Sequence, residues 1–190
     1  MPAVECLLIR HAQSQPAPDV AEDDWPLSEL GRRQADELRD RLAARGLEEL
    51  YSSPYPRAAA TLRPLAERLG LELRLVPELR ERRLAWPPLA SWREALRASW
   101  ADFELAHPGG ESSRACQARI RSAVLGILAR SRASRIAIAS HGNAIGLLLQ
   151  SMEPSFGYDE WARMRNPEIF RLSWDGLVLA WDRDGGPRQG

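Results

Sequence analysis

The sequence contains no lysine: all 26 basic residues among its 190 are arginine. A P-loop, a Schiff-base site and a lysine general base each need a lysine, so the sequence excludes these three kinds of site. Any anion that this protein binds must therefore be held by arginine, histidine or backbone N–H groups. We attribute the preference for arginine to a G+C-rich genome and give it no functional meaning.

Net charge and long apolar segments are lacking as well. The 26 acidic residues balance the 26 basic ones, so nucleic acid and anionic membranes are not expected as partners. The apolar runs are six or seven residues long, against the roughly 20 that cross a bilayer, and the N-terminus does not resemble a signal peptide. The two cysteines, Cys6 and Cys116, are expected to be free, buried thiols. These features predict a cytoplasmic protein.

The residue spacing typical of metal ligands is absent too. The chain has three histidines and contains neither His-x-x-x-His nor Cys-x-x-Cys. We therefore expect no metal and no cofactor. His107 stands in a loop rich in proline and glycine and is expected to be exposed and uninvolved, which leaves His11 and His141 for chemistry.

The chain does contain a regular alternation of short apolar segments and amphipathic ones. The predicted strands are 4–10, 48–53, 71–76 and 135–140, and the predicted helices are 27–46, 56–70, 111–131 and 143–152. An Asp-Gly turn at 175–176 predicts a β-hairpin over 169–182. The predicted fold class is α/β: a three-layer α/β/α sandwich with a mainly parallel central sheet and an antiparallel edge from the C-terminal hairpin. No linker interrupts residues 1–190, so we expect a single domain that buries roughly 70% of its unfolded surface.

The segment of about 87–108 departs from this alternation and predicts a small helical cap insertion. Prolines and glycines bracket the segment, and a helix is predicted over 89–105. One face of that helix carries Trp92, Leu96, Trp100 and Phe103. Two interpretations of the tryptophans stay open. They pack the cap onto the body, or, together with Trp86, they line the pocket mouth and select the substrate.

Polar residues gather where the predicted parallel strands end, and such sheets bind ligands at that edge. The residues are Arg10, His11, Arg57, Glu78, Glu81, His141, Gly142 and Asn143. Taken singly, each has a structural explanation, such as a hydrogen-bonded core histidine or a solvated carboxylate. Because they follow several strands at one edge, we interpret them together as an anion pocket with a nucleophile and an acid. Phosphate is the natural ligand, since arginine and helix N-termini both favour its negative oxygens.

Six segments resemble, in the same order, the sequence blocks of the histidine phosphatase superfamily, also called phosphoglycerate mutase-like. They are LIRHAQS (8–14), WPLSELGRRQA (25–35), LYSSPYPRAAAT (50–61), LRERRLAW (79–86), GGES (109–112) and SHGN (140–143). The resemblance implies that His11 is a nucleophile that becomes a phosphohistidine, and that Glu81 is the proton donor. It also implies that the phosphoryl oxygens and the substrate are held by Arg10, Arg57, His141, Gly142 and Asn143.

The chain departs from the pattern of this family at four places. Ala12 replaces a glycine, Gln13 replaces a glutamate, and Ala85 replaces the glycine after the acid. The segment SQPAPD (14–19) lacks an asparagine that contacts phosphate in the family. These departures leave the core chemistry intact and bear on substrate orientation and turnover.

The predicted activity is that of a metal-independent phosphomonoesterase acting on a small phosphorylated substrate. A phosphoglycerate-type phosphomutase is the alternative, favoured by the sequences ERR (81–83) and HGN (141–143). We prefer hydrolysis, because a mutase must shield its phosphoenzyme from water, and the cap is modest and the chain ends soon after the hairpin. A non-catalytic binder of phosphorylated ligands is less expected, since His11 and Glu81 are both present. The sequence leaves the oligomeric state open, and also the choice among sugar phosphates, phosphoamino acids, nucleotides and phosphoprotein.

Overall fold

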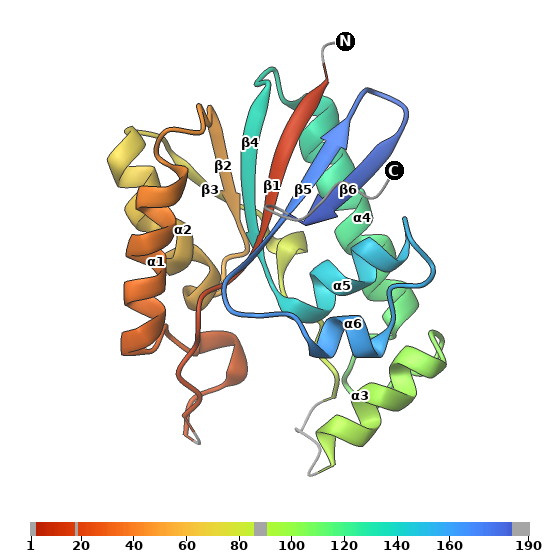
Figure 1. The fold of residues 1–190 in the computed structure, drawn as a ribbon. Helices are drawn as coiled ribbons and strands as arrows, with labels where there is room; N and C mark the ends of the chain where they lie inside the picture. Colours follow the sequence, from red (N-terminus) through yellow and green to blue (C-terminus); the bar gives the residue numbers. More distant parts are fainter. Residues whose placement is uncertain (1–2, 18, 86–90, 184–190) are drawn as a thin grey trace.

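Within residues 3–17, 19–85 and 91–183, which the computed structural model describes, six strands form one mixed sheet (Figure 1). In spatial order they are β3 (Leu73–Leu75), β2 (Glu49–Ser52), β4 (Arg135–Ser140), β1 (Val4–Arg10), β5 (Glu168–Trp174) and β6 (Leu179–Arg183). The first four are parallel, whereas β5 pairs antiparallel with β1 and β6 pairs antiparallel with β5. The predicted parallel sheet with a hairpin at its edge is therefore confirmed.

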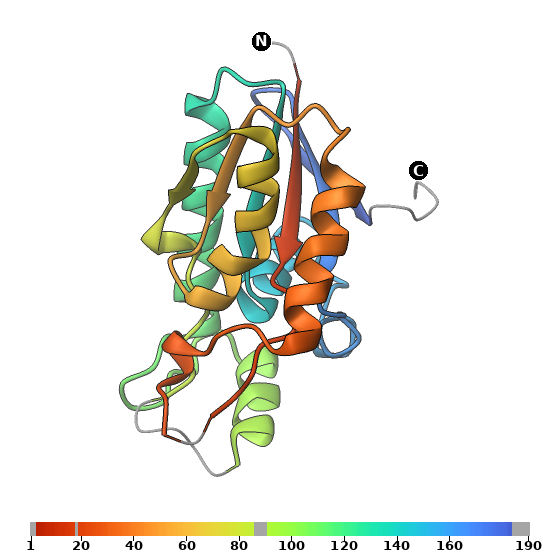
Figure 2. The same cartoon turned by 90° about the vertical axis from the view of Figure 1, so that its left-hand side faces the viewer.

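Helices cover both faces of the sheet and complete the three predicted layers (Figures 1 and 2). One face carries α1 (Glu29–Leu42) and α2 (Pro56–Leu69), and the other carries α4 (Ser113–Arg130) and α5 (Gly142–Gln150). Successive residues of β1 serve the two faces in turn, as the pleat of a strand requires. Leu7 and Ile9 pack with α1 and α2, whereas Cys6 and Leu8 pack with α4 and α5. Because both sides of β1 are covered, its central residues 6–9 are apolar without alternation.

Two short helices lie beyond the edge at which β1, β2 and β4 end (Figure 1). They are α3 (Trp92–Ala101) and α6 (Tyr158–Ala162). The prediction that the first of them continues to residue 105 was wrong. The Asp102 side chain accepts a hydrogen bond from the Glu104 N–H over 3.0 Å, and this turn ends the helix. Trp86, Pro87, Pro88 and the start of the predicted cap helix lie outside the described residues.

Single-turn 3₁₀ helices and one short α-helix were not predicted. The 3₁₀ helices are η1 (Glu22–Asp24) and η2 (Pro77–Leu79), and the α-helix is α6. With three to five residues each, they are too short to show a helical period in the sequence. All three nevertheless contribute residues to the surroundings of the candidate site.

Two predictions drawn from composition can be compared with the structure. Cys6 and Cys116 are free and buried, as predicted, and burial raises the pKa of both thiols. Thiols of this kind stay protonated and are unreactive. In the described part of the chain, no helix combines the length and the apolar character that a membrane span needs.

Candidate functional site

The structure brings four of the predicted site residues together from three strand ends. Arg10 is the last residue of β1 and His11 follows it, Arg57 is the second residue of α2, and His141 caps α5 directly after β4. The His11 N–H donates to the Ser140 carbonyl oxygen over 3.0 Å, which joins the ends of β1 and β4. The rings of His11 and His141 consequently lie 5.1 Å apart between centroids.

His11 is a buried, neutral imidazole that is 7% exposed. Its Nδ1 lies 2.7 Å from the carbonyl oxygen of Ala12. Because that oxygen can only accept, Nδ1 carries the proton and Nε2 keeps an unshared electron pair. Burial, followed by the charges of Arg57 and Arg10, outweighs the hydrogen bond to Ala12 and lowers the pKa of His11 to about 3. The imidazole is therefore neutral at pH 7, and such a ring can act as a nucleophile.

His141 is fully buried and presents one nitrogen without a partner. Its Nε2 lies 2.7 Å from the Ser53 hydroxyl oxygen, which also accepts a hydrogen bond from the Tyr55 N–H over 3.3 Å. The Ser53 hydroxyl proton finds a partner when the hydroxyl donates to Nε2 of His141. Nε2 then carries no proton, so the proton of the neutral ring is on Nδ1. Among the described residues, Nδ1 has no hydrogen-bond partner. Burial and the nearby His11 and Arg57 lower the pKa of His141, so the ring stays neutral.

Two arginines hold positive charge beside these histidines. Arg57 is 2% exposed, and its Nη1 donates to the backbone oxygen of Glu22 in η1 over 2.5 Å. Arg10 Nη1 donates to the Met164 carbonyl oxygen over 2.6 Å. Arg10 Nε is buried and has no partner in the described part of the chain. Both guanidinium groups thus have their orientation fixed by a backbone oxygen, with further N–H groups left for an anion.

The structure separates the two glutamates that follow β3. Glu78 is exposed, whereas the Glu81 carboxylate accepts hydrogen bonds at the N-terminus of α5. Glu81 Oε1 accepts from the N–H groups of Arg82 and Ala144 over 2.8 and 3.0 Å. Within the described part of the chain, Glu81 Oε2 accepts one hydrogen bond, from the Asn143 N–H over 3.1 Å. Since a carboxyl oxygen can accept two hydrogen bonds, Oε2 has a position left for a proton or a substrate oxygen.

Gly142 and Asn143 are the first two residues of α5 and contact neighbouring segments of the chain, and their predicted contact with substrate stays a prediction. The Asn143 side-chain oxygen accepts a hydrogen bond from Trp100 Nε1 in α3 over 3.2 Å. That amide therefore joins α5 to α3, and its backbone N–H binds Glu81. Gly142 is buried against Arg10, whose Cζ lies 3.2 Å from the point that a Cβ at this position would occupy. The glycine lets the guanidinium approach the helix terminus.

A buried network holds the loop that carries Glu81, and the sequence did not predict it. Arg82 is 5% exposed and donates to the hydroxyl oxygens of Ser99 and Ser113 over 2.8 and 2.9 Å. Arg119 pairs with Glu111 over 2.6 Å and donates to the backbone oxygens of residues 78 and 80 over 2.5 and 3.0 Å. These contacts fix the loop of residues 78–82 that carries the Glu81 carboxylate.

Other contacts concern the places where the chain departs from the family pattern. Ala12 is fully buried, and its N–H donates to the Thr61 hydroxyl over 2.9 Å. Gln13 is exposed, and its side-chain oxygen accepts from the Ser28 hydroxyl over 2.7 Å at the start of α1. Asn166, which the sequence did not single out, donates to the backbone oxygen of His11 over 2.7 Å. Together these contacts fix the backbone on both sides of the imidazole.

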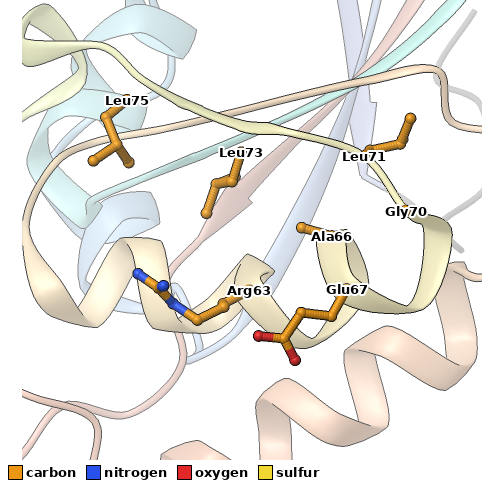
Figure 3. A pocket seen from close by; sticks show the side chains of 7 residues that line it. All are labelled: Arg63, Ala66, Glu67, Gly70, Leu71, Leu73 and Leu75. Atoms are coloured by element: carbon orange, nitrogen blue, oxygen red, sulfur yellow. The ribbon is translucent and has the colours of Figure 1, made fainter.

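Two cavities and the third histidine, His107, lie outside this group of residues or at its border. A cavity of about 440 Å³ lies between α2 and β3, and Figure 3 shows Arg63 and Glu67 beside three leucines there. No histidine is among the described residues that line it. A second cavity, of about 230 Å³, adjoins Arg10. His107 is half-buried, not exposed as predicted. In the described residues, no three His, Cys, Asp or Glu side chains form a group that could hold a metal ion.

The similar proteins include phosphatases and phosphoglycerate mutase-like proteins. A curated relative, probable phosphoglycerate mutase GpmB from Enterobacter sp. (strain 638), is 26% identical over 185 residues, covering 90% of this chain and 85% of that protein. A solved structure of mycobacterial glucosyl-3-phosphoglycerate phosphatase with VO3 has a TM-score of 0.79 and 27% identity, covering 95% of this chain and 98% of that one. Phosphoglycerate mutase from Bacillus anthracis str. Sterne has a TM-score of 0.77 at 16% identity, covering 96% and 92%, and shows the fold alone.

The match to a protein-family model shows to which family this chain belongs. The model described as histidine phosphatase superfamily (branch 1) matches residues 6–180, from β1 to the beginning of β6. The match includes every strand end that contributes to the site. The resemblance inferred from the sequence is therefore confirmed, and the chain belongs to branch 1 of the histidine phosphatase superfamily.

Proposed function

We propose that this protein is a phosphomonoesterase that hydrolyses small organic phosphates through a phosphohistidine on His11, without a metal ion. The observation that carries the proposal is the neutral His11 ring, which keeps an unshared electron pair on Nε2 and lies near Arg10, Arg57 and His141. Such a pocket suits a phosphate ester, because preorganised donors stabilise the negative oxygens of the transition state. The proposal includes a small phosphorylated substrate as partner, with no nucleic acid and no membrane. It also includes a cytoplasmic location, which the free buried cysteines support.

The proposed reaction has two steps. First, His11 Nε2 attacks phosphorus, a P–N bond forms, and the P–O bond to the leaving group breaks, while Glu81 gives a proton from Oε2 to the leaving oxygen. Then water attacks phosphorus, Glu81 takes a proton from that water, the P–N bond breaks and inorganic phosphate leaves. Arg10, Arg57 and the Nδ1–H of His141 hold the phosphoryl oxygens throughout.

A phosphoglycerate-type mutase is the second candidate, and the name of the curated relatives favours it. A mutase shares the first step and then returns the phosphoryl group to a second hydroxyl of the substrate instead of to water. Non-catalytic binding of a phosphorylated ligand is the third candidate. Such a binding protein would not need a reactive Nε2. A role of His11 in turnover therefore distinguishes the two enzymes from it.

The test is phosphate release from p-nitrophenyl phosphate in the presence of EDTA. We expect His11→Asn to lower the rate by a factor on the order of 10⁴ or more, as for other enzymes that lose their nucleophile. His107→Asn, on the loop between α3 and α4, is the matched control and should retain activity. Wild-type protein quenched during turnover of ³²P-labelled substrate should carry a label that is stable to base and labile to acid.

Three other results would contradict the proposal, each in a different way. Activity of His11→Asn within a few-fold of wild type would remove His11 as nucleophile. Interconversion of 2- and 3-phosphoglycerate without net release of phosphate would identify a mutase. Binding of phosphate esters without turnover of any of them would identify a binding protein.

A further inference from the structure

The cavity of about 230 Å³ lies between α3 and α6 and shares Arg10 with the proposed phosphate site. Its main lining residues are Arg10, Trp92, Arg93, Tyr158, Trp161 and Met164. Arg10 directly precedes His11 at the end of β1, and its Cζ lies 3.2 Å from the point that a Cβ at Gly142, the residue after His141, would occupy. Sites for drug-sized ligands have roughly 300–1,000 Å³. This smaller cavity suits a small organic group and not a nucleotide or a peptide.

Two N–H groups beside this cavity are buried and have no hydrogen-bond partner among the described residues. They are Arg10 Nε and Trp161 Nε1. Each lies 3.2 Å from the point that a Cβ at Gly142 would occupy, so the two donors lie together at the start of α5. Buried donors are rarely left unpaired in native proteins. Acceptor oxygens of a ligand would satisfy them.

The two tryptophans of α3 differ in their freedom to contact a ligand. Trp100 is 7% exposed, and its ring lies 3.2 Å from the point that a Cβ at Gly146 would occupy, so it packs against α5. Trp92 is 47% exposed and lines the cavity. The aromatic face available to a ligand is therefore that of Trp92, together with Tyr158 and Trp161.

The cavity wall combines aromatic rings with positive charge. The Arg93 guanidinium lies 5.1 Å from the centre of the Trp92 ring, and the Tyr158 and Trp161 rings are 5.5 Å apart between centroids. None of the described lining residues is acidic. Aromatic faces pack against flat ligand surfaces, and a guanidinium pairs with a carboxylate or a second phosphate. The wall is thus complementary to a ring that carries a negative group.

We propose that this cavity is the leaving-group subsite of the enzyme and that it takes the alcohol part of an organic phosphate with a ring and a negatively charged group. Trp161 Nε1 and Arg10 Nε donate to oxygens of the leaving group. Trp92 packs against the ring, and Arg93 pairs with the negative group. The inference rests on the proposed function and makes Trp92, Arg93 and Trp161 specificity-determining residues.

The experiment measures binding by calorimetry in the His11→Asn background, where esters are not consumed. The ligands are 4-carboxyphenyl phosphate, phenyl phosphate, ethyl phosphate and inorganic phosphate. Adding Arg93→Gln should lower the ratio of the affinities for 4-carboxyphenyl phosphate and phenyl phosphate by about three- to tenfold. Adding Trp161→Phe, which keeps a ring and removes the N–H, should weaken both aryl esters by about three- to tenfold. Affinity for inorganic phosphate should stay within about twofold in both variants.

The control is Arg68→Gln, the same change of charge on an exposed residue of α2. It should alter none of the four affinities. Two results would overturn the subsite. One is an equal loss of affinity for all ligands in Arg93→Gln, since Arg93 is exposed and its replacement does not put folding at risk. The other is unchanged affinity for all ligands in both cavity variants. The proposed function has a separate readout, turnover by the chain with His11 intact. Failure of that turnover would leave the binding result valid, so the two failures are distinguishable.

Discussion

The two sides of the proposed active site are held in different ways. On the sheet side, His11, Arg57 and His141 are each at most 7% exposed. The two histidines directly follow a strand, and Arg57 lies in the first turn of the helix after a strand. On the helix side, Trp92 is 47% exposed, and α3 reaches α5 through the Trp100 side chain. Main-chain hydrogen bonds between strands fix the first side, whereas side-chain packing fixes the second. We therefore assign the chemistry to the sheet edge and the selection of the substrate to α3 and α6.

The largest effect expected from the sheet side, apart from the loss of His11, concerns the acid. Glu81→Gln should slow hydrolysis of an alkyl phosphate by about 10²- to 10⁴-fold, the usual contribution of a general acid. It should slow p-nitrophenyl phosphate far less, because that leaving group departs without a proton. Glu78→Gln is the control, since Glu78 is exposed. A larger dependence on the leaving group in Glu78→Gln would show that the acid has been assigned to the wrong glutamate.

Truncating each tryptophan of α3 tests whether the helix side selects the substrate. Trp100→Ala removes a buried ring and should cost roughly 3–5 kcal/mol of unfolding free energy, lowering all activities together. Trp92→Ala should cost less than about 1 kcal/mol, because that ring is already half exposed. It should instead change the ranking of substrates while phosphate inhibits as before. Thermal melts beside a substrate panel separate the two effects, and an unchanged ranking in Trp92→Ala would remove the specificity role.

The pH dependence of stability tests the burial of the sheet side. The pKa of His11 falls from 6.5 in the unfolded chain to about 3 in the fold, so below pH 6.5 the unfolded state takes up a proton that the folded state does not. Stability from this group is thus complete above pH 6.5 and is lost as the pH falls toward 3. At pH 5 the free energy of unfolding should be lower by about 2 kcal/mol because of this group. Urea denaturation of wild type and His11→Gln at pH 7 and 5 measures it; equal losses in both proteins would contradict a neutral buried ring.

The smallest effect concerns the hydroxyl that sets the tautomer of His141. Ser53→Ala removes the donor to Nε2, so the ring proton can move there and Nδ1 loses its N–H toward the phosphate. We expect about a tenfold lower kcat/KM. The ¹⁵N shifts of His141 report the tautomer directly, which a purely structural role of Ser53 would not change. Ser52→Ala, another fully buried serine of the same strand end, is the control, and an unchanged tautomer in Ser53→Ala would contradict the assignment.

Residues that follow a strand directly could be located from the sequence. Arg10, His11 and His141 come immediately after buried apolar runs, and parallel strands end at the same edge, so local pattern was enough to predict that they meet. The network around Glu81 could not be found this way. Arg82 binds Ser113 across 31 residues, and Arg119 binds the loop across 41 and 39 residues. No periodicity relates positions so far apart.

The same limit explains the helix side of the site. Trp161 lies on a five-residue helix, too short to be recognised, and its buried N–H becomes visible only when α6 packs beside Gly142. Asn166 reaches the backbone of His11 across 155 residues. For Asn143, the sequence did not indicate that its side chain accepts a hydrogen bond from Trp100. A side chain that can serve a ligand or a neighbouring helix is assigned only by the packing.

The sequence by itself determined the α/β fold, the family and the order in which the candidate nucleophile, arginines and acid occur along the chain, because strand burial and short-range motifs are properties of neighbouring residues. Only the tertiary structure decided which nitrogen of His11 carries the proton and which donor fixes His141. It also decided which tryptophan faces the cavity beside Arg10. Those outcomes depend on hydrogen bonds and contacts between segments far apart in the chain, and such contacts form only when the layers of the fold pack together.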